Sequence, residues 1–559
     1  MSESTPDLSD QMRVDASDEE GFKAIFERVL SVIRGSQLTD ENYSPRRHSR
    51  LVPDDPVDAV GYEVERYWLN APFSYASIRY DDDENEHRYH VVEPTLTDDQ
   101  TALLDSLYDD VRNPLLYRES QEDDDPETLL REELRDRIED YGVVLSPGGF
   151  HALVYYLWRR FRGFGRLDPL MHDSKIEDIS CDGYEIPLYA YHDDYQDIAT
   201  TVSFGEESLD SFVIRMAQQA GQHISVGNPI VGTTLQDGSR AELTLGEEVT
   251  PHGSAFTIRK YSEEPFTPVD LLQFGTFSLQ QMAYLWIAIE NNKNIIFAGG
   301  TASGKTTSMN AISMFIPPRS KLITIEDTRE LSLYHDNWLS SVTRDRLDEE
   351  SDVTMYDLLR SALRHRPEYI LVGEVRGEEA ITLFQAMNTG HTTLSTMHAD
   401  SVQTVINRLE NEPINVPRPM VQSLDVLCVQ VLARLDGERV RRSKTISEID
   451  GIDQRTGELD YSNAFEWSTT DDSFSVGNRN LLDEIRRERG WSQGELLEEM
   501  RRRRRFLSHL RDENITNYQQ FTALVNEYYV DAEATMDALG IGTDGDTDQP
   551  PVTAEAGDD

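Results

Sequence analysis

The chain has 559 residues, and its 103 acidic and 53 basic side chains give a formal net charge of −50. This length exceeds what one hydrophobic core supports and predicts about three domains. So large a negative charge repels nucleic acids and anionic membranes, which argues against a nucleic-acid-binding protein. The two cysteines, Cys181 and Cys428, exclude a disulfide framework and a multi-cysteine metal site.

The N-terminal part is predicted to hold a disordered segment and an accessory region. Residues 1–20 are acidic and polar, which predicts disorder, and we expect no secretion signal there because the basic and apolar segments of a signal are missing. Residues 21–145 form the predicted accessory region. Its expected elements are a helix at Gly21–Ile33, strands at Tyr62–Trp68, Ser74–Tyr80 and His87–Val92, an acidic linker at Ser120–Asp125 and a helix at Thr128–Tyr141.

Residues 146–262 are predicted to form an α+β domain. A helix at Pro147–Phe161 precedes short alternating strands, and one amphipathic helix, Leu209–Gly221, interrupts them. The expected strands are Ile176–Cys181, Pro187–His192, Ala241–Leu245 and Ala255–Arg259. Two prolines between Tyr261 and Pro268 predict a linker to the next domain.

The pattern changes over residues 263–440, which predicts a second kind of domain. Apolar strands alternate with helices there, which indicates a parallel sheet, and their near-continuous apolar composition is typical of strands buried on both faces. The expected strands are Ile295–Ala298, Leu322–Ile325, Tyr369–Val372 and Thr393–Met397. We therefore predict an α/β domain with a parallel sheet, in which a ligand binds beyond the carboxyl ends of the strands.

Residues 441–540 are predicted to form an extension of strands and helices, followed by a disordered acidic tail at 541–559. Polar strands are expected over residues 441–476 and one long helix over Asn480–Leu510. That helix contains five consecutive arginines, Arg501–Arg505, close to acids such as Glu498. A solvated or intersubunit salt-bridged helix is therefore favoured over a track that binds nucleic-acid phosphates.

The clearest motif is Gly299–Thr306, GGTASGKT, which follows an apolar strand and precedes a helical segment. Its spacing, G-x-x-x-x-G-K-[ST], is that of a phosphate-binding loop, in which backbone N–H groups and the lysine contact phosphates and the final hydroxyl holds Mg²⁺. A glycine-rich turn arising by chance would lack the flanking strand and helix. We therefore predict that ATP and Mg²⁺ bind here. The predicted cofactor-binding residues are Gly299, Gly300, Thr301, Ala302, Ser303, Gly304, Lys305, Thr306 and Thr307.

Acidic residues follow two of the predicted strands. Glu326 follows the strand at Leu322–Ile325, and Glu374 comes two residues after the strand at Tyr369–Val372. Glu374 stands where phosphate-loop proteins carry a metal-holding aspartate, and its longer side chain also suits a base that polarises water. A helix cap or a solvated loop is the alternative for Glu326. It is less favoured for Glu374, because a charge that ends a buried strand needs a partner.

Two histidines and two arginines complete the predicted site. His391 and His398 lie on either side of the strand at Thr393–Met397, and at least one of them is predicted to sense the phosphate, although a single histidine is more often structural. Arg240 and Arg259 belong to the preceding domain. Each alone would more often be a surface residue, but together they could neutralise phosphate charge from that domain.

These segments together resemble the ATPases of type II and type IV secretion, type IV pili and the archaellum. The resemblance rests on the phosphate loop, ITIEDTREL, YILVGEVRG and TGHTTLSTMHAD, preceded by IEDISCDG, LQDGSR and FTIRK, over roughly Gly163–Leu435. The chain is most similar to archaeal members, and the archaellum motor ATPase is the preferred interpretation. Its acidic, lysine-poor composition also resembles that of proteins from a high-salt cytoplasm, as in a halophilic archaeon.

The resemblance implies a Mg²⁺-dependent ATPase with a RecA-like domain that works as a homohexamer. Catalytic roles would fall on Glu374, Glu326, His398, Arg240 and Arg259, and the metal would be held by Thr306 and Glu374. It also implies a cytoplasmic protein that binds a polytopic membrane platform and accessory proteins at the inner face of the membrane. The alternatives are a type IV pilus or secretion ATPase, a nucleic-acid-translocating ATPase, and a nucleotide-binding scaffold without hydrolysis.

Overall fold

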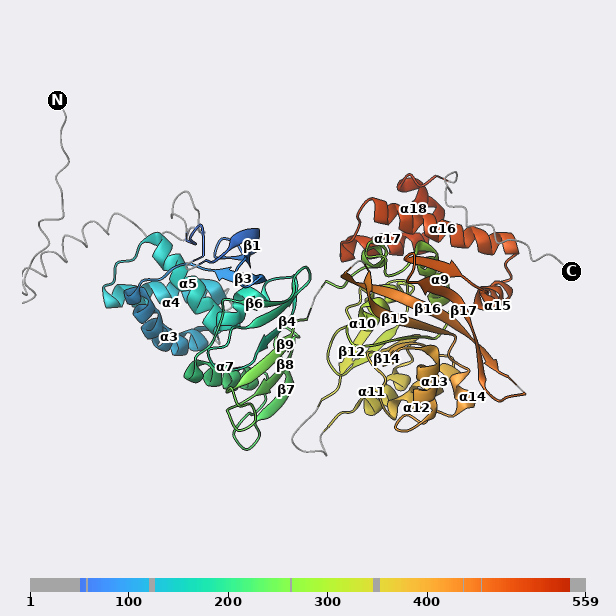
Figure 1. The fold of residues 1–559 in the computed structure, drawn as a ribbon, viewed down its shortest axis with the longest axis horizontal. Helices are drawn as coiled ribbons and strands as arrows, with labels where there is room; N and C mark the ends of the chain where they lie inside the picture. The colour runs from blue at the N-terminus through green and yellow to red at the C-terminus, as the bar shows by residue number, and fades with distance from the viewer. Residues whose placement is uncertain are drawn as a thin grey trace, which may run out of the picture. The chain divides into compact units, whose positions relative to one another are not determined.

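A computed structural model describes residues 51–56, 59–119, 126–261, 264–344, 352–435, 437–453 and 455–542. The chain divides into two compact units between Lys260 and Tyr261, close to the boundary expected at 262. Each unit contains a nine-stranded sheet (Figure 1). The helix predicted at Gly21–Ile33, the linker at Ser120–Asp125 and the segments 1–20 and 543–559 lie outside the described residues.

Unit 1 is built on a sheet of order β1-β2-β3-β6-β5-β4-β9-β8-β7. Its strands are antiparallel, except that β3 pairs in parallel with β6. The strands expected in the accessory region therefore share one sheet with those of the α+β domain. The strands are β1 (Tyr62–Asn70), β2 (Ser74–Asp81), β3 (Glu86–Val92), β4 (Ile176–Cys181), β5 (Tyr189–His192), β6 (Gln196–Thr200), β7 (Ile230–Thr234), β8 (Arg240–Thr244) and β9 (Ala255–Arg259). The sequence did not predict β6 and β7, which are short and polar.

The helices of unit 1 form two groups. One group packs around a core that includes Leu107, Leu134 and Leu157, and it consists of α3 (Asp98–Glu119), α4 (Pro126–Tyr141) and α5 (Pro147–Phe161). The helix α7 (Glu206–Gln219) buries Phe212 and Val213 in the core that the sheet contributes to. Between the groups lie the short η2 (Gly165–Leu167) and α6 (Asp168–Met171). The alternate, outward residues of β8 remain exposed, as expected for a sheet with one solvated face.

Unit 2 is built on a sheet of order β12-β11-β13-β14-β10-β15-β16-β17-β18. From β12 to β15 in this order, neighbouring strands pair in parallel, and from β15 to β18 they pair antiparallel. β15 therefore belongs to both parts of the sheet. This confirms the predicted α/β fold. The strands are β10 (Ile295–Gly299), β11 (Leu322–Glu326), β12 (Trp338–Val342), β13 (Tyr369–Val372), β14 (Thr392–His398), β15 (Val426–Leu435), β16 (Glu438–Ile452), β17 (Leu459–Ser468) and β18 (Ser473–Val476). The polar strands expected after residue 441 thus extend the same sheet.

Helices cover both faces of the parallel strands, and most of these strands are therefore apolar, although the buried β14 consists mainly of threonine and serine. Buried residues divide into one core on each face, with Phe297 and Cys428 in one and Ile296 and Val429 in the other. The first core also contains residues of α8 (Pro268–Gln273), α9 (Leu279–Glu290) and α10 (Lys305–Ser313). The second contains residues of α11 (Met355–Ala362), α12 (Glu379–Asn388), α13 (Val402–Glu410) and α14 (Arg418–Val421). A 3-10 turn, η4 (Leu363–His365), follows α11.

The single long helix predicted over Asn480–Leu510 is wrong, because the chain forms two helices there. The first, α15 (Asn480–Arg489), ends at Gly490, whose φ of 68° is left-handed. The second, α16 (Gln493–Asp512), begins with a reciprocal cap between Ser492 and Glu495. Two further helices follow, α17 (Tyr518–Val530) and α18 (Ala532–Ala538).

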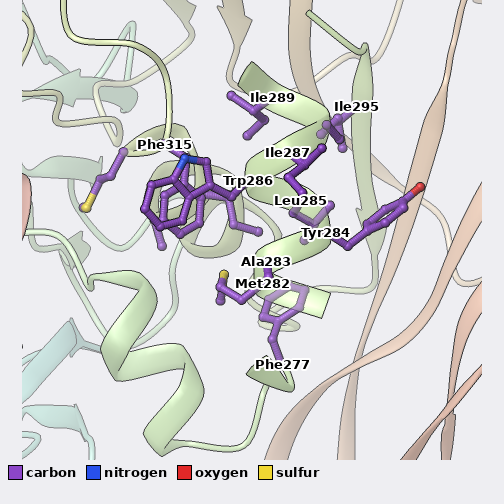
Figure 2. Close-up of a cluster of buried hydrophobic side chains, with 14 of the residues drawn as sticks. Phe277, Met282, Ala283, Tyr284, Leu285, Trp286, Ile287, Ile289, Ile295 and Phe315 are labelled. Atoms are coloured by element: carbon purple, nitrogen blue, oxygen red, sulfur yellow. The ribbon is translucent and has the colours of Figure 1, made fainter. Parts of the chain in front are cut away.

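The C-terminal helices complete the core around α9. This helix is buried on every side, and Trp286 at its centre stacks on Phe315 with ring centroids 4.6 Å apart and planes within 7° (Figure 2). Phe506 of α16 and Tyr528 of α17 pack against the same indole. A helix that is apolar all round needs such a cover. Among the described residues, no helix is long and apolar enough to cross a membrane.

Candidate functional site

The predicted site residues of unit 2 gather at the carboxyl edge of the parallel strands. The strands β11, β13, β14 and β10 are neighbours in that order, so their carboxyl ends lie side by side. Glu326 ends β11, and Glu374 comes two residues after β13. His398 ends β14 and pairs in register with Gly299, the last residue of β10. The sheet therefore brings both acids, one histidine and the phosphate loop to one edge.

The loop between β10 and α10 has the shape of an anion-binding turn. Ala302 and Gly304 have left-handed φ angles of 57° and 86°. The hydroxyl of Ser303 and the ammonium of Lys305 both donate to the carbonyl of Gly300, at 2.8 and 2.9 Å. Successive N–H groups in such a turn, which runs into the N-terminus of a helix, attract phosphate oxygens.

Two glycines of this loop face very different surroundings. A Cβ on Gly299 would lie 2.3 Å from Ser303 Oγ and 2.6 Å from the carbonyl oxygen of Gln430. A Cβ on Gly300 would meet no atom within 4 Å. The first position thus requires glycine for close packing. Thr306 and Thr307 lie in the first turn of α10, as the loop motif requires.

Glu326 is buried, with 1 % of its surface exposed, and its carboxylate is only partly satisfied. Oε1 accepts hydrogen bonds from the backbone N–H groups of Glu330 and Leu331, both at 2.9 Å. Oε2 has no partner among the described residues. Burial raises the pKa of this carboxyl to about 7, although the two backbone bonds lower it. A carboxyl that is only half ionised at neutral pH suits proton transfer better than ion pairing.

Gly373 packs against Glu326, since a Cβ on this glycine would be 3.3 Å from Glu326 Cγ. Glu374 is the next residue in the chain. Its carboxylate accepts a hydrogen bond from Arg376 Nη2 at 2.6 Å, and Arg376 also lies 3.7 Å from Asp327. Glu374 is half-buried, so it can contact both the protein and a ligand. Lys305 is nearby: burial lowers the pKa of its ammonium, and the charge of Glu374 partly opposes that shift.

The two histidines lie at opposite ends of β14. His391 precedes the strand, and its ring lies 3.2 Å from the hydroxyl of Thr389, whereas His398 is exposed at the edge that carries the phosphate loop. Only His398 is therefore placed for the predicted contact with a phosphate.

The residues at this edge fit a magnesium ion bound together with phosphates. Among the described residues, no cluster of three or more histidine, cysteine or acidic side chains could hold a metal by itself. Mg²⁺ is commonly held by one or two protein oxygens, with phosphates and water completing the shell. The hydroxyl of Thr306, the carboxylate of Glu374 and the unpartnered Oε2 of Glu326 are ligands of that kind.

The two predicted arginines lie in unit 1 and are neighbours there. Arg240 begins β8 and pairs directly with Arg259 at the end of β9, so both side chains stand on the same, outward face of the sheet. Arg259 forms an ion pair with Asp178 of β4 at 3.0 Å. Their contact with a nucleotide in unit 2 remains a prediction.

Two further residues contact the phosphate loop, and the sequence analysis missed both. Arg441 of β16 donates from Nε to the carbonyl of Ala302 at 3.0 Å. Gln430 of β15 is buried beside Gly299. The four apolar residues that begin β15, Val426–Val429, mark it as a strand, but the partner of Arg441 depends on the register of the β15–β16 pair.

Comparisons with known proteins place this chain among described families. Residues 233–473 match the model for "Type II/IV secretion system protein". Residues 20–95 match "PilB3-like, N-terminal", and residues 470–548 match "PilB3-like, C-terminal".

Individual relatives agree with these matches. The uncharacterized protein MJ0900 of Methanocaldococcus jannaschii is 37 % identical over 399 residues, which cover 70 % of this chain and 72 % of the relative. The type IV secretion system protein PtlH of Bordetella pertussis is 30 % identical over 42 % of this chain and 79 % of its own. A crystal structure of the VirB11 ATPase from the Brucella suis type IV secretion system, in complex with sulphate, is 27 % identical. The similarity covers 50 % of this chain and 91 % of the VirB11 chain, with a TM-score of 0.27.

Proposed function

Because the chain belongs to the type II/IV secretion system protein family, we propose that it hydrolyses ATP at the carboxyl edge of the unit 2 sheet and uses this reaction to drive a filament-assembling or secreting machine. The observation that carries this proposal is the meeting of three groups at one edge. They are a loop shaped for phosphates, its lysine, and two glutamates at the ends of the neighbouring strands β11 and β13, one of which has an unpartnered buried oxygen.

The chain's own residues supply the steps of hydrolysis. The loop N–H groups and Lys305 bind the β- and γ-phosphates and fix their position. Glu374 orients the attacking water and accepts its proton, and Glu326, with its pKa near 7, shares this role. His398, which pairs in register with Gly299, would contact the γ-phosphate.

Thr306 and Glu374 would hold Mg²⁺, which when bound neutralises charge on the phosphates. Arg240 and Arg259 add positive charge from unit 1, whether from the same chain or from a neighbouring one. Removal of Mg²⁺ with a chelator should abolish turnover, and restoring it should recover turnover in full.

We further propose that the motor works as a homohexamer on the cytoplasmic side of the membrane, bound to a polytopic platform protein and to accessory proteins. The archaellum is the preferred filament, as the sequence resemblance implies, and a type IV pilus or a secretion machine is the alternative. PtlH is named as a type IV secretion system protein, which favours keeping that alternative in the test. The net charge of −50 disfavours nucleic acid as the moved substrate.

The catalytic part of the proposal is tested with the purified chain. ATP hydrolysis should depend on Mg²⁺ and should fall to background in Lys305→Ala, whereas Lys321→Ala, a control lysine on the loop before β11, should keep wild-type turnover. Equal turnover in both variants would contradict the proposed site.

The filament is tested in the host. Deletion of the gene should abolish swimming and leave surface adhesion intact if the motor serves an archaellum. Loss of adhesion with normal swimming would assign it to a pilus. If neither changes, secretion is the remaining role, and turnover should then be measured with and without single-stranded DNA.

A further inference from the structure

The strands β15 and β16 form a wall beside the phosphate loop. β15 pairs in parallel with β10, with Gln430 opposite Gly299, and then continues five residues further to Leu435. β16 returns antiparallel, which places Arg441 opposite Leu432. Alternation along β15 puts Gln430 and Leu432 on one face, and Arg441 shares it. This is the face that α10 covers, since Cys428 and Ile446 lie in the same core as Met309.

Arg441 supports the loop at its most constrained turn. Its Nε–H donates to the carbonyl of Ala302, a residue with a left-handed φ of 57°. Its Cδ lies 3.4 Å from the position that a Cβ on Gly304 would take. A non-glycine residue in this backbone region is strained and persists only where neighbouring groups hold it. The Arg441 guanidinium is such a group, and it crosses 139 positions of sequence to reach the loop.

Gln430 has no structural reason to be a glutamine. It is 1 % exposed, and among the described residues neither its amide oxygen nor its amide nitrogen has a hydrogen-bond partner. Ser443, its strand neighbour on β16, is also buried with an unpartnered hydroxyl. An unpaired buried polar group lowers stability, because it loses its hydrogen bonds to water when the chain folds. An apolar side chain here would make a more stable protein, so the amide is retained at a cost to stability.

We propose that Gln430 and Arg441 are positioning residues of the phosphate loop. Arg441 holds the Ala302 carbonyl outward, so that the N–H groups of the loop face the phosphates. Gln430 provides an amide next to Gly299, which pairs with polar groups of the loop when the loop closes on a nucleotide. This inference rests on the proposed ATP hydrolysis, because it concerns the geometry of the same site.

The test for Arg441 compares Arg441→Gln with Arg439→Gln, which removes an exposed arginine two residues earlier on the same face of the same strand. In Arg441→Gln, the Kd for MgADP and the KM for ATP should rise about tenfold, the loss expected for a charged hydrogen bond, while kcat changes by less than about threefold. Arg441→Lys, which keeps a cationic donor, should recover part of the affinity. Arg439→Gln should match the wild type.

The test for Gln430 is Gln430→Leu, a change of similar volume. The variant without nucleotide should melt at or above the wild-type temperature, yet its Kd for MgADP should rise several-fold, about threefold or more. A lower melting temperature with unchanged Kd would show an ordinary packing role and would overturn the assignment for this residue. Unchanged nucleotide binding in Arg441→Gln would overturn the assignment for Arg441.

MgADP binding and ATP hydrolysis by the wild type distinguish a failure of the proposed function from a failure of the proposed roles of Gln430 and Arg441. A wild-type chain that binds no MgADP and hydrolyses no ATP contradicts the proposed function itself. A wild-type chain that binds and hydrolyses normally, alongside Gln430 and Arg441 variants that do the same, contradicts only the role of the β15–β16 wall.

Discussion

Charge gathers at two places in unit 2, the carboxyl edge of the sheet and the five-arginine run of α16, and the two differ in how well the charges are paired. Along the run, carboxylates of the same chain lie close to the arginines. The ion pairs are Arg501–Glu498 at 3.8 Å, Arg502–Glu499 at 3.2 Å, Arg503–Glu290 and Arg503–Glu499 at 2.5 Å, and Arg505–Glu498 at 2.8 Å. At the sheet edge, by contrast, Glu326 forms no ion pair among the described residues, and its Oε2 has no hydrogen-bond partner there.

This difference shows why the five-arginine run, although its charge density is higher, is less suited to bind a ligand than the sheet edge. Arg503 is 3 % exposed and lies over the rings of Trp286 and Tyr528, at 5.3 and 5.7 Å. It is part of a core and cannot serve a nucleic-acid backbone. The sequence predicted a solvated or intersubunit salt-bridged helix; the salt bridges are present, but their partners belong to the same chain. A buried carboxylate without a cationic partner, rather than charge density, marks the edge that acts on a ligand.

The largest expected effect is on catalysis at the sheet edge. Glu374→Gln keeps the side-chain shape but cannot accept a proton, so kcat should fall by about 10²- to 10⁴-fold while the Kd for MgADP stays within threefold. Glu378→Gln, an exposed residue four positions further on, should have wild-type turnover. Full turnover in Glu374→Gln would contradict a catalytic role for this glutamate.

A smaller effect is expected from the paired region, and on stability instead of catalysis. Arg503→Met leaves Glu290 without its closest partner, and the free energy of unfolding should fall by about 2–4 kcal/mol. The loss stays below the full cost of a broken buried pair, because Glu290 keeps a second arginine, Arg489, at 3.8 Å. Arg501→Met, at a side chain that is 53 % exposed, should change stability by less than about 0.5 kcal/mol. Denaturant unfolding measures both, and equal losses would contradict the distinction.

A third effect concerns the packing of the loop. Gly299→Ala forces a Cβ against Ser303 and the Gln430 backbone, so the free energy of unfolding should fall by about 1–3 kcal/mol and nucleotide binding should weaken. Gly300→Ala, one residue on, adds a Cβ into open space. Its melting temperature without nucleotide should match that of the wild type. If Gly299→Ala and Gly300→Ala have the same melting temperature, the loop accommodates a Cβ at Gly299 more easily than its contacts imply.

The smallest effect is a pH dependence at the opposite end of the sheet. Asp425 accepts hydrogen bonds from the backbone and side chain of Asn294, and burial raises its pKa to about 6. Between the unfolded value of 3.8 and about 6, the unfolded state loses its proton first, so this group's contribution to stability is lost as the pH rises.

Asp425→Asn removes that slope. Relative to the wild type, the variant should therefore gain about 1–2 kcal/mol between pH 4 and pH 7. Melting curves of both proteins across this range measure the difference, and a constant offset would show that the carboxyl does not titrate as described.

Much of unit 2 could be predicted from the sequence, because its buried strands are short apolar runs that end in polar motifs. The predicted β13 matches the observed strand, and β10, β11 and β14 each differ by one or two residues. β12 was missed. In this edge strand Trp338 and Leu339 are followed by two serines, so the apolar–polar alternation of a strand is lacking and the segment resembles a loop. The break at Gly490 was missed although its signals were present, a glycine followed by the Ser492–Glu495 cap.

The site was predictable where its residues follow parallel strands, because all such strands end at one edge. Lys305, Thr306, Glu326, Glu374 and His398 were found in this way. Gln430 and Arg441 could not be, because no local motif relates β15 or β16 to a loop far before them in sequence. The choice between His391 and His398 needed only the direction of β14.

The burial of α9 limits where this chain can be truncated. Its apolar surface is closed by helices that lie beyond residue 473, where the match to the secretion-protein model ends. A version of this chain trimmed to that match would leave the indole of Trp286 without Phe506 and Tyr528. Such a fragment would expose apolar surface, and we expect it to precipitate or self-associate. The smallest stable form of this chain therefore includes the C-terminal helices, which cover α9.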